Sequence, residues 1–158
     1  ITVIIFIIPF MVNPITFEKG KYEINSNENR KMDFSIIYSN SDIEQPKIDL
    51  TTGKHLVGFF SSTCQHCVVS GYNLKVLFNQ HPEWSMYFFI NGDDADLVHF
   101  HALTKSESVP HSKLPGKELL LMAGNKLPAI FLINNSSIEQ RISPDNIDET
   151  FINNWFLN

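Results

Sequence analysis

The sequence has few of the residues that would build a scaffold held together by disulfides or by a structural metal. Its 158 residues contain only two cysteines, Cys64 and Cys67. A single CxxC pair cannot form a four-thiolate zinc site, and two cysteines are too few for a secreted fold held by several disulfides. The pair is therefore predicted to be a local dithiol that cycles between thiol and disulfide.

Basic residues are also scarce. Twelve Lys and Arg stand against 17 Asp and Glu, so the net charge is −5, and the pI is near 5.6. No basic face is available to meet phosphate groups, which argues against a nucleic-acid partner. The hydrophobic content of 43% with 18% charged residues is typical of a globular protein. The length suits one domain of ordinary size with an appendage.

The chain opens with an apolar run over residues 1–12 that contains no charged side chain. Twelve residues form about 18 Å of helix, whereas the hydrocarbon core of a bilayer is about 30 Å thick. The run also lacks the basic start and the A-x-A site of a signal peptide. We interpret it as the end of a transmembrane helix whose upstream part precedes Ile1, with Pro9 and Asn13-Pro14 at the helix exit. A buried N-terminal element of the domain is the alternative interpretation.

Residues 13–46 are polar and rich in Asn, and they are predicted to be a tether with a possible first strand at residues 34–38. Residues 47–158 alternate between strand and helix patterns and are predicted to form the folded domain. We expect strands at 56–60, 85–90, 128–133 and 138–142, and helices at 64–80, 93–105, 116–123 and 143–156. This order is a βαβ unit followed by a β-hairpin and a helix, which indicates an α/β fold.

Two motifs resemble the thioredoxin-like superfamily. One is the dithiol at a strand-to-helix junction, FFSSTCQHC at residues 59–67, and the other is Leu127-Pro128 at the start of the strand 129–132. The resemblance covers roughly residues 56–158. It implies a three-layer α/β/α sandwich with a central mixed sheet, a cis peptide bond before Pro128 and thiol–disulfide exchange without a cofactor.

The apolar lead-in followed by such a module also resembles the C-terminal domain found after DoxX-like membrane regions. That resemblance implies a membrane-anchored domain on the extracytoplasmic, periplasmic side. The charged residues that follow the apolar run have mixed signs and do not themselves indicate on which side of the membrane the domain lies.

Three positions depart from the thioredoxin pattern. Gly58 stands where thioredoxins have a buried Asp that moves protons for the second cysteine, and Thr63 replaces the usual Trp. Leu127 precedes the proline, where Thr, Ile or Val is commoner. Proton handling during turnover is therefore expected to come from water or from another group.

The residues around the dithiol have separable expected roles. Cys64, at the helix N-terminus, is the candidate nucleophile because unpaired N–H groups and the helix dipole favour a thiolate there. Cys67 is placed one turn later to resolve a mixed disulfide, and His66 is expected to favour the thiolate of Cys64. A stabilised thiolate predicts a potential above the −270 mV or so of thioredoxin, nearer the roughly −180 mV of protein disulfide isomerase. The residues expected to position a partner chain are Thr63, Gln65, Leu127 and Pro128.

Other functions remain open on sequence alone. Cys64, His66 and Cys67 could bind Cu(I) or Zn²⁺ if His99, His101 or His111 supplied a fourth ligand, although His99 and His101 are more simply surface residues. A redox-inactive interaction module is a further alternative. Asp93, Asp94 and Asp96 lack the spacing of a calcium loop, and helix capping explains them. The expected partners are protein thiols or disulfides and a redox partner protein, bound by a monomeric domain.

Overall fold

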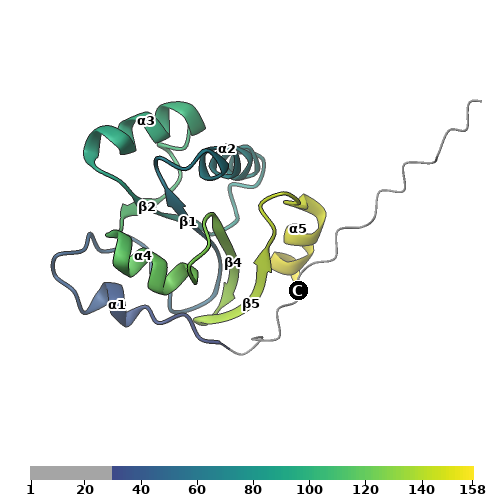
Figure 1. Ribbon diagram of the computed structural model, residues 1–158. Helices are drawn as coiled ribbons and strands as arrows, with labels where there is room; N and C mark the ends of the chain where they lie inside the picture. Colours follow the sequence, from purple (N-terminus) through teal and green to yellow (C-terminus); the bar gives the residue numbers. More distant parts are fainter. Residues whose placement is uncertain (1–29) are drawn as a thin grey trace, which may run out of the picture.

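A five-stranded mixed sheet forms the centre of the computed structural model, which describes residues 30–158 (Figure 1). Its order is β3-β2-β1-β4-β5, with β1 at the centre. β2 is parallel to β1 and β3, whereas β4 is antiparallel to β1 and β5. The strands are β1 (Lys54–Ser61), β2 (Met86–Asn91), β3 (His111–Lys113), β4 (Ala129–Asn134) and β5 (Ser137–Ile142).

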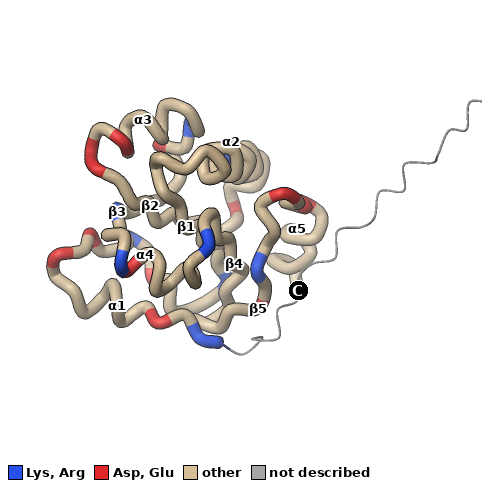
Figure 2. Tube along the Cα trace, viewed as in Figure 1, with Lys and Arg blue, Asp and Glu red and all other residues tan. Residues whose placement is uncertain are grey.

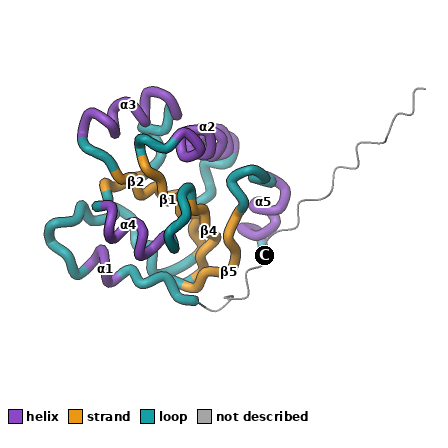
Figure 3. Tube along the Cα trace, viewed as in Figure 1, coloured by secondary structure: helices purple, strands orange, loops and turns teal. Residues whose placement is uncertain are grey.

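Helices cover both faces of the sheet, and side-chain alternation along the strands explains why. Leu56 and Phe60 of β1 pack into one buried cluster, and the intervening Val57 and Phe59 pack into another. The first cluster is covered by α2 (Gln65–Gln80), α3 (Asp94–Thr104) and α5 (Glu149–Leu157). The second is covered by α1 (Ser35–Tyr38) and α4 (Gly116–Ala123) (Figure 3). The expected three-layer α/β/α sandwich is confirmed.

Several helix ends follow the signals in the sequence. The side chain of Asp93 accepts a hydrogen bond from the backbone N–H of Asp96 and caps α3, as expected. His81 is the C-cap of α2, and Gly124 is the C-cap of α4, where its positive φ of 79° suits glycine. None of the helices within residues 30–158 is long and apolar enough to cross a bilayer. The apolar run at residues 1–12 lies outside the described residues.

The strand expected at residues 34–38 is wrong, because residues Ser35–Tyr38 form the short helix α1. The side chain of Asp33 accepts hydrogen bonds from both the backbone N–H and the hydroxyl of Ser35, which starts the turn. Phe34 and Ile37 are then buried on the side of the sheet that α1 and α4 cover. The apolar residues that suggested a strand instead make core contacts from this short helix and its N-cap.

Two further elements differ from the expectation. Strand β3 was not predicted, because three residues at a sheet edge carry no usable alternation. The last helix was expected from residue 143 but begins at Glu149, where the side chain of Asp148 accepts a hydrogen bond from the N–H of Phe151. The segment that contains Pro144 forms a turn instead, closed by a bond from the N–H of Asn146 to the carbonyl of Ser143.

Candidate active site

The dithiol lies where the central strand β1 passes into α2. Cys64 has an extended backbone and is the N-cap of α2, so the expected helix begins one residue later, at Gln65. Its N–H donates to the carbonyl of Ser61, and its carbonyl accepts from the N–H of Val68. This turn holds Cys64 half-buried, next to the unpaired N–H groups of the first helical turn.

Cys67 is fully buried one turn further along α2. Its sulfur accepts a hydrogen bond from the backbone N–H of Ser61 over 3.4 Å and is in hydrogen-bonding contact with the Cys64 side chain. Burial, and then the contact with Cys64, raise the pKa of Cys67 to about 12, while the Ser61 N–H acts in the opposite direction. Both cysteines are free thiols. At neutral pH Cys67 is therefore protonated, and Cys64 is the accessible sulfur.

The Leu127–Pro128 peptide bond is cis. Pro128 is buried and precedes β4, whose Ala129 pairs with Phe59 of β1, so the proline lies toward the end of β1 that leads to the dithiol. Leu127 is partly buried and packs against the same cluster as Cys64 and Cys67. The two sequence motifs, about sixty residues apart, are thus brought to one end of the sheet.

Gly58 is explained by the ring of Phe60. A Cβ atom at Gly58 would lie 2.5 Å from the Phe60 ring, closer than real Cβ contacts allow. Phe60 is itself fixed by an edge-on contact with Phe88, with ring centroids 4.9 Å apart. An aromatic ring therefore occupies the side of β1 on which an acid at position 58 would project. Within residues 30–158, the groups that shift the pKa of Cys67 in addition to burial are Cys64 and Ser61, and neither of them is an acid.

The remaining predicted site residues lie on the surface around Cys64. Thr63, Gln65 and His66 are exposed, and the Thr63 hydroxyl is 3.3 Å from that of Ser61. Residues 55–74 contain no Lys, Arg, Asp or Glu, so the charges lie on other parts of the fold (Figure 2). His66 is consequently the one side chain of the CQHC motif that can carry a positive charge.

Sequence reasoning missed two contributors to this site. Ser61 acts on Cys67 through its backbone N–H, so the amino-acid type at position 61 gave no indication of this role. The role of Phe60 follows from its position two residues after Gly58, because residues i and i+2 of a strand share a face. That spacing could have indicated the contact in advance.

The expected metal ligands do not converge. Within residues 30–158, no group of three or more His, Cys, Asp or Glu side chains is placed to hold a metal ion. His99 is exposed, as a surface residue would be, but His101 is only 7% exposed, so its interpretation as a surface residue is wrong. Helix α3 buries it beside Phe100.

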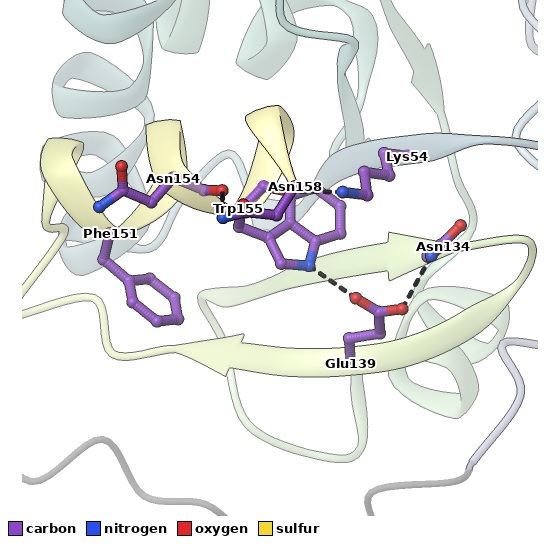
Figure 4. Close-up of a pocket in the computed structure, with 7 residues that line it drawn as sticks. All are labelled: Lys54, Asn134, Glu139, Phe151, Asn154, Trp155 and Asn158. Atoms are coloured by element: carbon purple, nitrogen blue, oxygen red, sulfur yellow. Dashed lines mark hydrogen bonds between the residues drawn. The ribbon is translucent and has the colours of Figure 1, made fainter.

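A cavity of about 440 Å³ lies between α5 and the β4–β5 hairpin, by the N-terminal end of β1. The carboxylate of Glu139 accepts hydrogen bonds from the Trp155 indole N–H and from Asn134, and the ammonium of Lys54 donates to the Trp155 carbonyl (Figure 4). These polar groups are therefore hydrogen-bonded to one another along the wall of the cavity. The arrangement fastens α5 to the sheet at the end opposite the dithiol.

No family model matches the chain, and no curated protein matches it in sequence. Its fold does match solved structures. A Chlorobium tepidum protein named as thiol:disulfide interchange protein DsbE superposes with a TM-score of 0.59 at 16% identity, over 83% of this chain and 96% of that one.

The thioredoxin domain of a thiol-disulfide oxidoreductase from Bacteroides vulgatus gives a TM-score of 0.56 at 15% identity, over 67% of this chain and 81% of that one. A secreted disulfide oxidoreductase from Mycobacterium tuberculosis gives 0.53 at 9% identity, over 66% and 81% of the two chains. At these identities the likeness shows the fold. The chain has the thioredoxin-like fold that these thiol–disulfide oxidoreductases share.

Proposed function

We propose that this chain is a thiol–disulfide oxidoreductase that exchanges disulfides with protein cysteines through its CQHC dithiol. The observation that carries the proposal is the unequal pair of sulfurs. Cys64 is accessible at a helix N-terminus, and it contacts Cys67, which is buried and receives the N–H of Ser61. An accessible attacking sulfur with a covered resolving sulfur suits two-step disulfide exchange.

The two steps balance without a cofactor. The Cys64 thiolate attacks one sulfur of a partner disulfide, forms a mixed disulfide, and releases the other partner sulfur as a thiolate that takes a proton from water. Cys67 then gives its proton to water and attacks the Cys64 sulfur, which forms the Cys64–Cys67 bond and releases the second partner thiol. Two electrons pass from the dithiol to the partner, and the reverse sequence oxidises a partner dithiol.

The exposed residues around Cys64 have proposed roles in this exchange. His66 favours the Cys64 thiolate by its N–H and its partial positive charge. The backbone next to Pro128, with Leu127, positions the partner chain, and Thr63 and Gln65 line its approach. Exposure of Thr63, Gln65 and His66, together with the common placement of Leu127 and Cys64, supports these roles.

We further propose that the domain works as a monomer on the extracytoplasmic side of a membrane, tethered by residues 1–12. The apolar composition of that run supports the tether, and the secreted protein among the structural neighbours supports the compartment. Fractionation of cells that express the protein with and without the apolar segment that includes residues 1–12 tests this. Loss of membrane association in the shortened chain is expected, and unchanged association would overturn the tether.

A redox titration in glutathione buffers tests the exchange activity. We expect one cooperative two-electron transition between about −280 and −120 mV, which both Cys64→Ser and Cys67→Ser abolish. The Cys67→Ser variant should accumulate mixed disulfides with partner proteins, and Cys64→Ser should not. If no transition occurs and the chain instead binds Cu(I) stoichiometrically against a chelator, the metal-binding alternative replaces the proposal. If neither occurs, the domain is a redox-inactive interaction module.

A further inference from the structure

A chain of hydrogen bonds fixes the protonation of the buried His101. The Thr104 hydroxyl donates its hydrogen to the carbonyl of Phe100 over 2.8 Å. The Ser106 hydroxyl lies 2.6 Å from that of Thr104 and must be the donor between them, because each hydroxyl has one hydrogen. The Ser106 oxygen, 3.0 Å from Nδ1 of His101, is then left to accept. His101 therefore carries its hydrogen on Nδ1 and has a lone pair on Nε2.

His111, at the start of the edge strand β3, has the same tautomer. Its Nδ1 lies 2.7 Å from the carbonyl oxygen of Val109, which can only accept a hydrogen bond. Nδ1 therefore carries a hydrogen, which leaves Nε2 as the nitrogen through which the ring could bind an ion. A backbone carbonyl or a similar acceptor on the second nitrogen is what orients most metal-binding histidines.

The two imidazoles are neighbours, and one of them lacks a partner. Their ring centroids are 4.3 Å apart, and the planes are inclined by 45°. Nε2 of His101 is buried without a hydrogen-bond partner, which is costly for a polar atom at that depth. His111 is only partly buried, so the pair can be reached from solvent.

We propose that His101 and His111 form a binding site for a divalent first-row transition-metal ion, distinct from the dithiol. Imidazole nitrogens suit such ions, and a ring with a hydrogen on Nδ1 binds them through Nε2. Two imidazoles that bind one ion at about 2.0 Å in adjacent coordination positions have ring centres about 4.5–5 Å apart, which is close to the observed 4.3 Å. The ion would join the end of α3 to the edge strand β3.

The surroundings favour a cation. Glu107 is an exposed acid whose negative charge acts on His101. No third His, Cys, Asp or Glu converges on the pair within residues 30–158. The remaining coordination positions are therefore assigned to water, which makes the site a moderate-affinity one.

Titration with Ni²⁺ in a Cys64→Ser background tests the site, because this substitution keeps the dithiol from competing for the ion. Calorimetry should give one Ni²⁺ per chain, and His111→Gln should weaken binding roughly tenfold or more. His99→Gln is the matched control, since His99 lies on the same helix but is exposed, and it should change the affinity less than about twofold. Ser106→Ala, which removes the acceptor on Nδ1, should also weaken binding roughly tenfold.

A second measurement needs no substitution of the buried His101, which could unfold the protein. Paramagnetic Ni²⁺ should broaden the amide resonances near residues 101–111 in the otherwise unmodified Cys64→Ser chain. Absence of saturable binding would overturn the proposal. Equal losses in His99→Gln and His111→Gln would also overturn it, because they would indicate adventitious binding to surface histidines only.

Discussion

The backbone N–H of Ser61 donates a hydrogen bond to the sulfur of Cys67 over 3.4 Å, from the last residue of β1 to the first turn of α2. This bond is a polar contact that favours the thiolate of a sulfur otherwise enclosed by apolar side chains. It also ties the resolving cysteine to the strand that carries the dithiol. The position of Cys67 is therefore set by the backbone of the central strand.

The raised pKa of Cys67 predicts a large difference in reactivity between the cysteines. At pH 7 iodoacetamide should modify Cys64 in the Cys67→Ser variant well before it modifies Cys67 in the Cys64→Ser variant. Alkylation of Cys67 should accelerate with pH without a plateau below pH 9, because burial holds its pKa near 12. Mass spectrometry after timed quenching measures both rates. Equal rates at pH 7 would reverse the assignment of nucleophile and resolving cysteine.

The same shift predicts how the reduced protein responds to alkali. The folded pKa of Cys67 lies above the ordinary value of 9.0, so the folded state retains a proton that the unfolded state releases. This contribution to stability is complete below pH 9 and is lost as the pH rises from about 9 toward 12. Denaturant unfolding of wild type and Cys67→Ser at pH 7 and pH 10 checks the prediction, and the wild type should lose more stability than the variant.

Gly58→Ala should destabilise the protein by about 1–3 kcal/mol, because the added methyl group meets the Phe60 ring in a packed sheet. The effect should shrink in a Phe60→Leu background, where the clashing ring atoms are absent. Urea unfolding of the two single variants and the double variant forms a double-mutant cycle. Strictly additive costs would show that the Phe60 ring is not what excludes a side chain at position 58.

The sequence predicted the placement of its two local motifs better than that of the surrounding elements, for physical reasons. The CQHC motif and Leu127-Pro128 are local patterns with strong backbone consequences, and they lie where they were expected, at one end of the sheet. The three residues of β3 are a strand only because β2 pairs with them. The buried ring of His101 likewise contacts His111, ten residues away, and helical periodicity does not encode such a contact.

Glu149→Gln should lower the pKa of His81 toward its ordinary value. The Glu149 carboxylate lies 2.8 Å from Nε2 of His81 and is the largest cause of the raised pKa, ahead of Glu83 at 3.2 Å. Glu83→Gln is the matched control and should have a smaller effect. Following the His81 ring protons by NMR across pH 5–9 measures each pKa, and a larger shift in Glu83→Gln would contradict the order.

The raised pKa of His81 also makes the stability of the protein depend on pH. His81 holds its proton more tightly in the folded state, so its contribution is fully present below the unfolded pKa of about 6.5. The contribution is lost as the pH rises through the raised folded pKa. Wild type should therefore exceed Glu149→Gln in stability by more at pH 5.5 than at pH 8.5. Thermal unfolding at the two pH values measures this, and an equal difference at both would exclude the charged pair as its source.

His66→Ala should make the dithiol less oxidising. His66 is exposed beside Cys64, and residues 55–74 carry no Lys or Arg that could replace its positive charge. An exposed pair of opposite charges contributes up to about 1 kcal/mol, so a fall of up to about 20 mV is expected in the glutathione titration. Gln65→Ala, at the neighbouring exposed position, should leave the potential unchanged. A potential that does not change in His66→Ala, or that changes as much in Gln65→Ala, would show that the helix N-terminus alone stabilises the Cys64 thiolate.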